Sequence, residues 1–109
     1  MTYNNIGNVY KDQGKYDLAL ENYQLSLDIQ KEQLGQRHPD VATTCSNLGN
    51  VYHKQGKHES ALENYHLSLE IRKGLLGEHH PDVAQSYNNI GSVHYEQGDF
   101  ASALRCSEL

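Results

Sequence analysis

Histidine and cysteine are the residues of this chain best suited to hold a metal ion or to act as a nucleophile. The 109 residues include 7 histidines and 2 cysteines. A metal site needs side chains that converge, but no HExxH pattern occurs, and the adjacent His79 and His80 cannot easily direct both rings at one ion. His38 and His80 occupy the same linker position in two repeated segments, which is better explained by a helix start. We therefore expect no metal and no cofactor.

The cysteines lack the partners that catalysis requires. A nucleophilic cysteine needs a base beside it in a cleft, whereas His53 lies about two helical turns from Cys45, too far for a direct hydrogen bond. We expect Cys45 to pack in the core and Cys106 to be exposed. Because no nucleophile–base pair or carboxylate pair is present, we expect no enzymatic activity. Two cysteines without CxxC spacing suit a reducing compartment, so the expected location is cytoplasmic.

The charge and hydropathy patterns exclude two further kinds of partner. The formal net charge is −5, with acidic and basic residues interspersed, whereas binding to a phosphate backbone requires clustered lysine and arginine. No apolar run of about 18 residues is present, and the first residues are neither basic nor apolar as a secretory signal would be. We expect no nucleic acid and no membrane among the partners.

A repeat organises the whole chain. The segment LGQRHPDVA ends at Ala42, and LGEHHPDVA ends at Ala84, 42 positions later. At this offset glycine, alanine and tyrosine recur at Gly7, Gly49 and Gly91, at Gly14, Gly56 and Gly98, at Ala19, Ala61 and Ala103, and at Tyr23 and Tyr65. A fixed period of this length predicts one repeat array over residues 1–109, with repeats at about 1–36 and 37–78 and a partial repeat at about 79–109.

Each repeat is expected to contain two helices. Pro39 is suited to the first position of a helix, and Asp40 then lies at the positive end of the helix dipole. Gly56 is expected to end this helix with a positive φ, and Gly77 is expected to end the second helix. The pattern predicts five full or nearly full helices, of about 17–19 residues, and a short sixth.

Small residues indicate how the helices pack. A glycine inside a helix, such as Gly49, costs roughly 0.5–1 kcal/mol relative to alanine, so its repetition suggests close approach of a partner helix. We expect this glycine to face the repeated alanine of the second helix, Ala61, with Tyr52 packed beside them.

These residues resemble the tetratricopeptide repeat. The resemblance rests on Ile6-Gly7-x-x-Tyr10 followed by Ala19 and Tyr23, and on the same pattern one repeat later. The 42-residue period and the His-Pro-Asp linker are similar to kinesin light chain-like and nephrocystin-3-like repeats, and Asn47–Asn50 is similar to spindle-orientation scaffolds of the Pins type, which rank second. The resemblance implies an all-α, right-handed superhelical solenoid of antiparallel helix pairs, with about two and a half repeats.

The third repeat departs from the family pattern, since His94 and Ser107 replace its tyrosines. Repeat stacks usually need polar terminal caps, and neither end supplies one. One hypothesis is therefore self-association, in which the terminal helices pair between molecules to give a dimer or a higher assembly.

The resemblance also implies that the first helices line a concave groove, whose positions are rich in asparagine. A carboxamide both donates and accepts hydrogen bonds, as does each residue of a peptide backbone, so the groove is suited to an extended protein segment. The residues expected to bind it are Asn4, Asn5, Asn8, Lys11, Asn47, Asn50, His53, Lys54, Asn88, Asn89 and Tyr95. The remaining groove positions are Asp12, Ser46, Ser92 and Glu96.

Two alternatives stay open for this groove. Asn5, Asn47 and Asn89 have a second interpretation, in which they bond the neighbouring helix and not a ligand. A chaperone tail with a terminal carboxylate is disfavoured, because Lys11 and Lys54 are the only lysines or arginines at the groove positions. The main hypothesis is a non-enzymatic interaction scaffold for an extended peptide.

Overall fold

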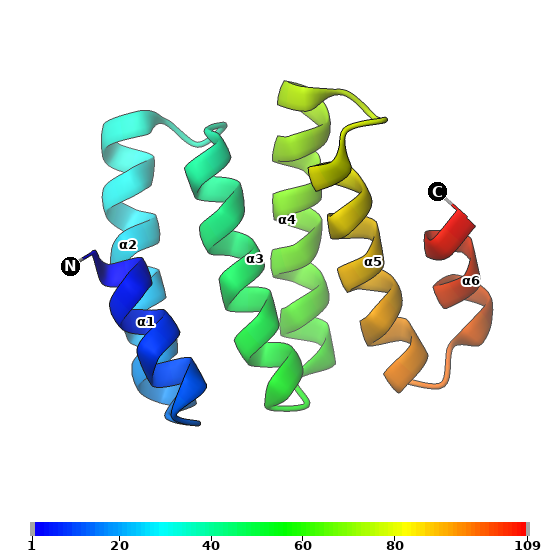
Figure 1. Cartoon of the computed structure of the whole chain (residues 1–109), viewed down its shortest axis with the longest axis horizontal. Helices are drawn as coiled ribbons and strands as arrows, with labels where there is room; N and C mark the ends of the chain where they lie inside the picture. The colour runs from blue at the N-terminus through cyan, green and yellow to red at the C-terminus, as the bar shows by residue number, and fades with distance from the viewer. Residues whose placement is uncertain (1, 109) are drawn as a thin grey trace.

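The computed structural model describes residues 2–108, without the side chains of residues 100, 101, 107 and 108. The departure from the repeat pattern at Ser107 therefore lies outside the described side chains. The described chain contains six helices and no strand, in the order α1 (Tyr3–Asp12), α2 (Tyr16–Leu34), α3 (Pro39–Lys54), α4 (His58–Leu76), α5 (Pro81–Glu96) and α6 (Phe100–Glu108). Consecutive helices run antiparallel and stand side by side (Figure 1).

The first helices begin as the sequence predicts. Pro39 and Pro81 are the first residues of α3 and α5, where the missing N–H of proline removes no helical hydrogen bond. The Nδ1 atom of His38 accepts a hydrogen bond from the backbone N–H of Asp40, at 3.1 Å, and His80 does the same for Asp82. The repeated His-Pro-Asp segment is thus a helix N-terminus, which confirms the prediction for both histidines.

Glycines end the helices or follow them closely. Gly56 has a φ of +76° and Gly77 a φ of +85°, a region that favours glycine, so the positive φ predicted at Gly56 is confirmed. The second helices α2 and α4 have 19 residues each, and α3 and α5 have 16. With 10 residues α1 is short, as is α6 with 9, so the structure has four long helices where five were expected. The repeat boundaries themselves stay a prediction.

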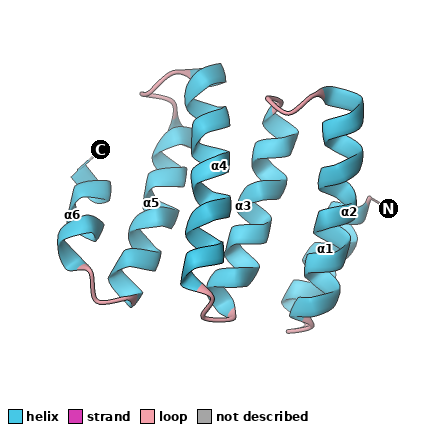
Figure 2. Cartoon of the chain, turned by 180° about the vertical axis from the view of Figure 1, so that it is seen from behind, coloured by secondary structure: helices cyan, strands magenta, loops and turns pink. Residues whose placement is uncertain are grey.

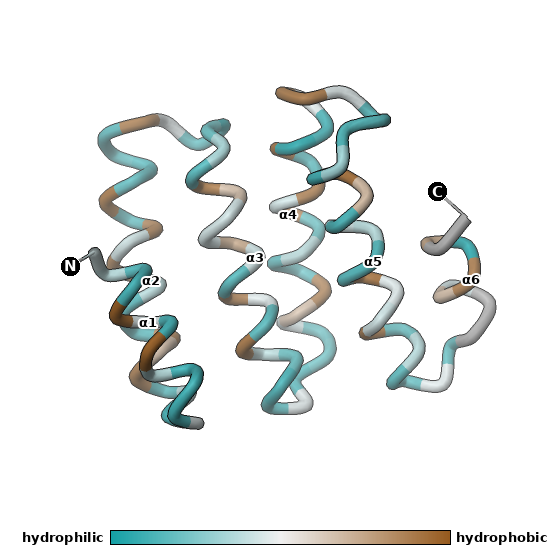
Figure 3. Tube along the Cα trace, viewed as in Figure 1, coloured by the Kyte–Doolittle hydropathy of each residue, from teal (hydrophilic) through white to brown (hydrophobic). Residues whose placement is uncertain are grey.

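The helices form two layers. The first helices α1, α3 and α5 lie on one side, and α2 and α4 lie in front of them when the molecule is seen from behind (Figure 2). Apolar residues recur along each helix as short bands between polar ones (Figure 3), which lets a narrow stripe of each helix face its neighbours. The stack measures 39 × 31 × 18 Å.

Two apolar clusters hold neighbouring repeats together. The first contains residues of α2, α3 and α4, namely Ala19, Tyr23, Leu27, Val41, Ala42, Cys45, Leu48, Val51 and Ile71. The second contains residues of α4 and α5, namely Ala61, Tyr65, Leu69, Val83, Ile90 and Val93. Each cluster therefore joins a second helix to the first helix of the following repeat.

The packing of the helix glycines differs from the expectation. A Cβ atom on Gly49 would lie 2.7 Å from ring carbons of Tyr65, so the nearest neighbour is this tyrosine ring and not Ala61. Gly7 meets Tyr23 in the same way. The closest contact of the glycine in these two repeats is therefore a tyrosine ring of the second helix, which the prediction did not include, and only a hydrogen on the glycine leaves room for that ring. A Cβ atom on Gly91 would lie 3.1 Å from Cβ of Cys106 and 3.5 Å from the backbone oxygen of Ala103.

Candidate peptide-binding surface on the first helices

A cavity of about 270 Å³ lies where the three first helices meet. Its lining residues are Lys11 from α1, Asn50, His53 and Lys54 from α3, and Glu96 from α5. The first four were predicted to bind a peptide, and Glu96 was assigned to the groove as well. Residues up to 85 positions apart in the sequence thus contribute to one hollow because the repeat places equivalent positions side by side.

Charges of both signs face this cavity. The Nε2 atom of His53 lies 2.8 Å from Oε2 of Glu96, which makes an ion pair when the histidine is protonated and links α3 to α5. Apart from this contact, Nε2 of His53 is buried and has no hydrogen-bond partner among the described residues. Two lysines and one carboxylate offer both donors and an acceptor to a polar ligand.

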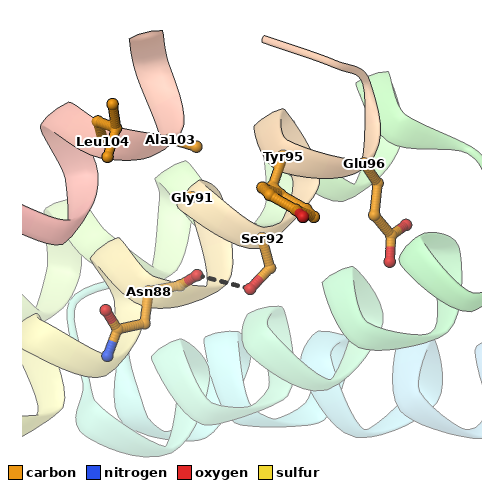
Figure 4. A pocket seen from close by; sticks show the side chains of 7 residues that line it. All are labelled: Asn88, Gly91, Ser92, Tyr95, Glu96, Ala103 and Leu104. Atoms are coloured by element: carbon orange, nitrogen blue, oxygen red, sulfur yellow. Dashed lines mark hydrogen bonds between the residues drawn. The ribbon is translucent and has the colours of Figure 1, made fainter. Parts of the chain in front are cut away.

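A larger cavity, of about 590 Å³, lies between α5 and α6. Asn88, Ser92, Tyr95 and Glu96 line it from α5, and Ala103 and Leu104 line it from α6 (Figure 4). The hydroxyl of Ser92 donates a hydrogen bond to the backbone oxygen of Asn88, at 3.0 Å. Glu96 lines both cavities.

Two of the predicted binding asparagines have partners within their own repeat. The hydroxyl of Tyr23 donates a hydrogen bond to Oδ1 of Asn8, and the hydroxyl of Tyr65 donates one to Oδ1 of Asn50. Each bond fixes the amide so that its oxygen is used internally and its NH₂ group is left as the donor for a ligand. Burial is the main cause that raises the pKa of each tyrosine to about 12, and the carboxylates of Asp12 and Glu96 add to it.

Asn4 bonds the following repeat. Its Nδ2 atom donates to Oγ1 of Thr44, at 3.0 Å, and Thr44 in turn lies 2.7 Å from Oε1 of Gln30. The three residues join α1, α2 and α3. At the equivalent groove position of the second repeat, the hydroxyl of Ser46 is buried against that of Ser68, at 2.7 Å. This row of the groove therefore contributes to packing between helices.

The remaining asparagines make no side-chain hydrogen bond to another residue that the structure describes. Asn5 and Asn88 are exposed, and Asn47 and Asn89 are half-buried. The open alternative of a bond to a neighbouring helix thus applies to Asn4 and not to the row of Asn5, Asn47 and Asn89. Peptide binding by these residues stays a prediction.

Gly91, Ala103 and Leu104 were not predicted as site residues, although they line the larger cavity. Leu104 is equivalent to Leu62, which packs against the second apolar cluster, so its repeat position indicates a core residue. The sequence held no signal that Leu104 faces a cavity, because repeat position alone does not say whether a helix covers it.

The residues first considered for metal or nucleophile chemistry do not assemble into a site. Cys45 is buried in the first apolar cluster as predicted, and burial raises the pKa of its thiol. Cys106 is half-buried and less accessible than expected, and burial raises its pKa too. Among the described residues no three histidine, cysteine or acidic side chains gather around a common point, and no helix is long and apolar enough to cross a membrane.

Comparisons with known proteins agree with this architecture. A family profile described as tetratricopeptide repeat matches residues 1–73 and again residues 41–108. The crystal structure of BtubC (BKLC) from P. vanneervenii has a TM-score of 0.91 to this chain, with 33% identity over 97% of the chain and 42% of that structure. A search of curated proteins gave no match.

Two further crystal structures share the fold alone. One is the structure of a kinesin light chain from Podosopora anserina, which has nearly identical TPR-like repeats. Its TM-score is 0.84 at 21% identity, and the match covers 97% of this chain and 50% of that one. The TPR domain of FLU from Arabidopsis gives 0.83 at 18% identity, covering 97% of this chain and 86% of that one. The chain therefore spans 42% of the length of the BtubC structure and 50% of the Podosopora anserina structure. With two profile matches that together span nearly all of its residues, the chain belongs to the tetratricopeptide repeat family and has its superhelical fold.

Proposed function

We propose that the chain binds an extended peptide segment of a partner protein along the surface formed by α1, α3 and α5. Tetratricopeptide repeats are in general non-enzymatic scaffolds for protein–protein interaction. The observation that carries the proposal is the central cavity, in which Lys11, Asn50 and Glu96 come from three different first helices. A ligand that follows such a surface must itself be elongated, because the hollow runs across the repeats.

Hydrogen bonding supports a peptide backbone as the ligand. Each backbone residue offers one donor and one acceptor, and the amides of Asn47 and Asn89 can meet both. The NH₂ groups of Asn8 and Asn50, oriented by tyrosine, can donate to peptide carbonyl groups, as can Lys11. Because one short groove offers few such contacts, we expect micromolar affinity, about −8 kcal/mol.

The experiment selects peptides from a displayed random library on the immobilised 109-residue chain and measures their affinity for variants. Asn47→Ala and Asn89→Ala should each weaken binding by about 1–2 kcal/mol, the loss of one amide contact. Asn64→Ala is the matched control, since this asparagine lies on the second helix α4, where its side chain donates to the backbone oxygen of Ser60. Circular dichroism would show that each variant remains folded.

If the two groove variants bind the selected peptides as tightly as the unmodified chain, the groove assignment is wrong. Equal losses in Asn64→Ala and in the groove variants would point to a general effect on the fold. As part of the same proposal we place the protein in the cytoplasm, since Cys45 and Cys106 are both free thiols, as a reducing compartment allows.

A further inference from the structure

We propose that the central cavity binds a side-chain carboxylate of the peptide, so that an aspartate or glutamate of the partner lies between Lys11 and Lys54. This inference rests on the proposed peptide-binding function and names the ligand chemistry at one point of that surface. The cavity, of about 270 Å³, lies where α3 stands between α1 and α5 (Figure 1).

The groups that this cavity leaves free are hydrogen-bond donors. Lys11 is half-buried and Lys54 is exposed, and neither makes an ion pair with another residue that the structure describes. Oδ1 of Asn50 accepts a hydrogen bond from the hydroxyl of Tyr65, so the NH₂ group of this amide is left to donate. Two ammonium groups and one amide NH₂ group thus face the same hollow, and a ligand that enters it must supply acceptors.

The one carboxylate that lines the cavity is directed at a histidine. Oε2 of Glu96 lies 2.8 Å from Nε2 of His53, whose side chain is only 19% exposed. Glu96 makes no ion pair with Lys11 or Lys54. The two lysines therefore have no counter-charge in contact, although a carboxylate lies in the same cavity.

The balance of charge favours a single carboxylate as the ligand. With His53 uncharged, two ammonium groups face one carboxylate, which leaves one positive charge in excess. A carboxylate side chain carries one negative charge, whereas a phosphorylated side chain carries about 1.5 to 2 near neutral pH. A chaperone tail with several carboxylates stays disfavoured for the same reason. The cavity is thus matched to one aspartate or glutamate side chain.

The repeat supports a ligand role for the two lysines over a structural one. Lys54 is equivalent to Asp12 and Glu96, and Lys11 is equivalent to His53. Packing residues such as the helix glycines keep their type at this offset, whereas these two positions change in charge from one repeat to the next. Asp12 is exposed and does not line the cavity. Residues that differ between repeats cannot serve a packing contact common to all of them, and they give each repeat its own contact with a peptide.

The selected peptides test the carboxylate directly. Peptides that bind the unmodified chain in the library experiment should share an aspartate or glutamate at one position. Its replacement by asparagine or glutamine should weaken binding about tenfold, because a charge-assisted contact with both lysines is lost. Phosphoserine at that position should bind no better than glutamate, and tighter binding of the phosphoserine peptide would overturn the assignment in favour of a phosphate.

The lysine variants show whether this carboxylate lies in the cavity. Lys11→Gln and Lys54→Gln should each weaken binding of the acidic peptide about three- to fivefold, as for a partly exposed ion pair, and should leave its glutamine form unaffected. A double-mutant cycle measures this coupling. Lys31→Gln is the matched control, since this exposed lysine lies on the second helix α2. The inference is wrong if the lysine variants lose the same factor with both peptides, or if Lys31→Gln loses as much.

Glu96 provides a test in the opposite direction. Glu96→Gln should strengthen binding of the acidic peptide about threefold, because it removes a like charge from the cavity. Glu63→Gln, at an exposed glutamate of α4, changes the net charge equally and should leave binding unchanged. Weaker binding of the acidic peptide by Glu96→Gln would contradict a ligand carboxylate in this cavity.

A blocked amino acid separates this inference from the proposed function. In nuclear magnetic resonance titrations of the isotope-labelled chain, N-acetylglutamate N-methylamide should shift the backbone amide signals of Asn50 and Lys54, and the glutamine analogue should not. Equal shifts with both analogues, or none with either, overturn the inference even if no peptide is selected. If peptide binding depends on Asn47 and Asn89 but not on an acidic residue, the groove proposal survives and this inference fails. If the glutamate shifts occur while Asn47→Ala and Asn89→Ala bind peptides normally, the reverse holds.

Discussion

Asn8 and Asn50 each accept a hydrogen bond from the equivalent tyrosine of their own repeat, Tyr23 and Tyr65 respectively. The phenol of Tyr23 or Tyr65 lies in the core and can donate its hydrogen bond only while it is protonated. Since a phenolate would be left in apolar surroundings, burial raises the pKa of both side chains to about 12. Each tyrosine–asparagine hydrogen bond therefore links the orientation of a candidate binding amide to a buried side chain of the core.

This coupling predicts a loss of stability in alkali. In the unfolded chain both tyrosines have the usual phenol pKa of about 10, whereas in the folded chain their pKa is about 12. Their contribution to stability is therefore complete below pH 10 and is lost as the pH rises toward 12. Urea unfolding at a series of pH values should show a steeper decline above pH 10 for the unmodified chain than for the double variant Tyr23→Phe, Tyr65→Phe.

The control for this prediction is Tyr3→Phe, because Tyr3 is exposed and its substitution should keep the steep decline. Both phenylalanine substitutions also remove a hydrogen bond, which lowers stability by about 1 kcal/mol each at neutral pH, so the slope and not the absolute value is the readout. Equal slopes in all three proteins would contradict the assignment.

The first two helix pairs pack closely because α1 and α3 each present a glycine to a tyrosine ring of the second helix. A methyl group at Gly49 would lie 2.7 Å from Tyr65, well inside van der Waals contact, and the ring is held by its bond to Asn50. Gly74 in α4 is different, because a methyl group there would meet only the end of the exposed, flexible Arg37 side chain. A side chain at Gly49 is thus excluded by a packed ring, whereas at Gly74 it would only displace a flexible side chain.

Substitution by alanine should separate the two cases. Gly49→Ala gains helix propensity but overpacks the contact with Tyr65, and we expect a net loss of roughly 1–2 kcal/mol in unfolding free energy. Gly74→Ala gains the propensity without a rigid clash, and we expect stabilisation of up to about 1 kcal/mol. Urea denaturation of both variants measures the difference, and a Gly49→Ala protein as stable as Gly74→Ala would refute the close contact.

The stack as a whole gains stability from contacts between adjacent repeats. Both apolar clusters include residues of α4, since Ile71 belongs to the first cluster and Tyr65 to the second. The polar bonds of Thr44 and Ser86 to the preceding repeats follow the same scheme. Stability in such an array is approximately a sum over repeats and their interfaces, so it is greatest where both neighbours are present.

Hydrogen exchange should reveal this gradient. We expect amides of α3 and α4 to exchange most slowly and those of α1 and α6 most rapidly, because the outer helices each have fewer partners. Uniform protection along the chain would mean that the stack unfolds only as a unit.

The sequence alone was sufficient to determine the elements and the family of this protein. The 42-residue period can be read from the sequence directly. The His-Pro-Asp helix starts and the glycines after α1 to α5 are local signals, because a cap or a turn depends on residues a few positions apart. The burial of Cys45 was predictable for the same reason, since its spacing places it on the apolar face of a helix.

Only the tertiary structure decided which side chains meet. Asn4 bonds Thr44 across 40 positions, and Gly49 faces Tyr65 where Ala61 was expected. Spacing along a helix fixes the face on which a side chain lies, but its partner depends on the rotation and distance of a second helix, which no local pattern records. For that reason the sequence predicted an asparagine-rich surface, and the folded chain showed which of those amides are already used within it.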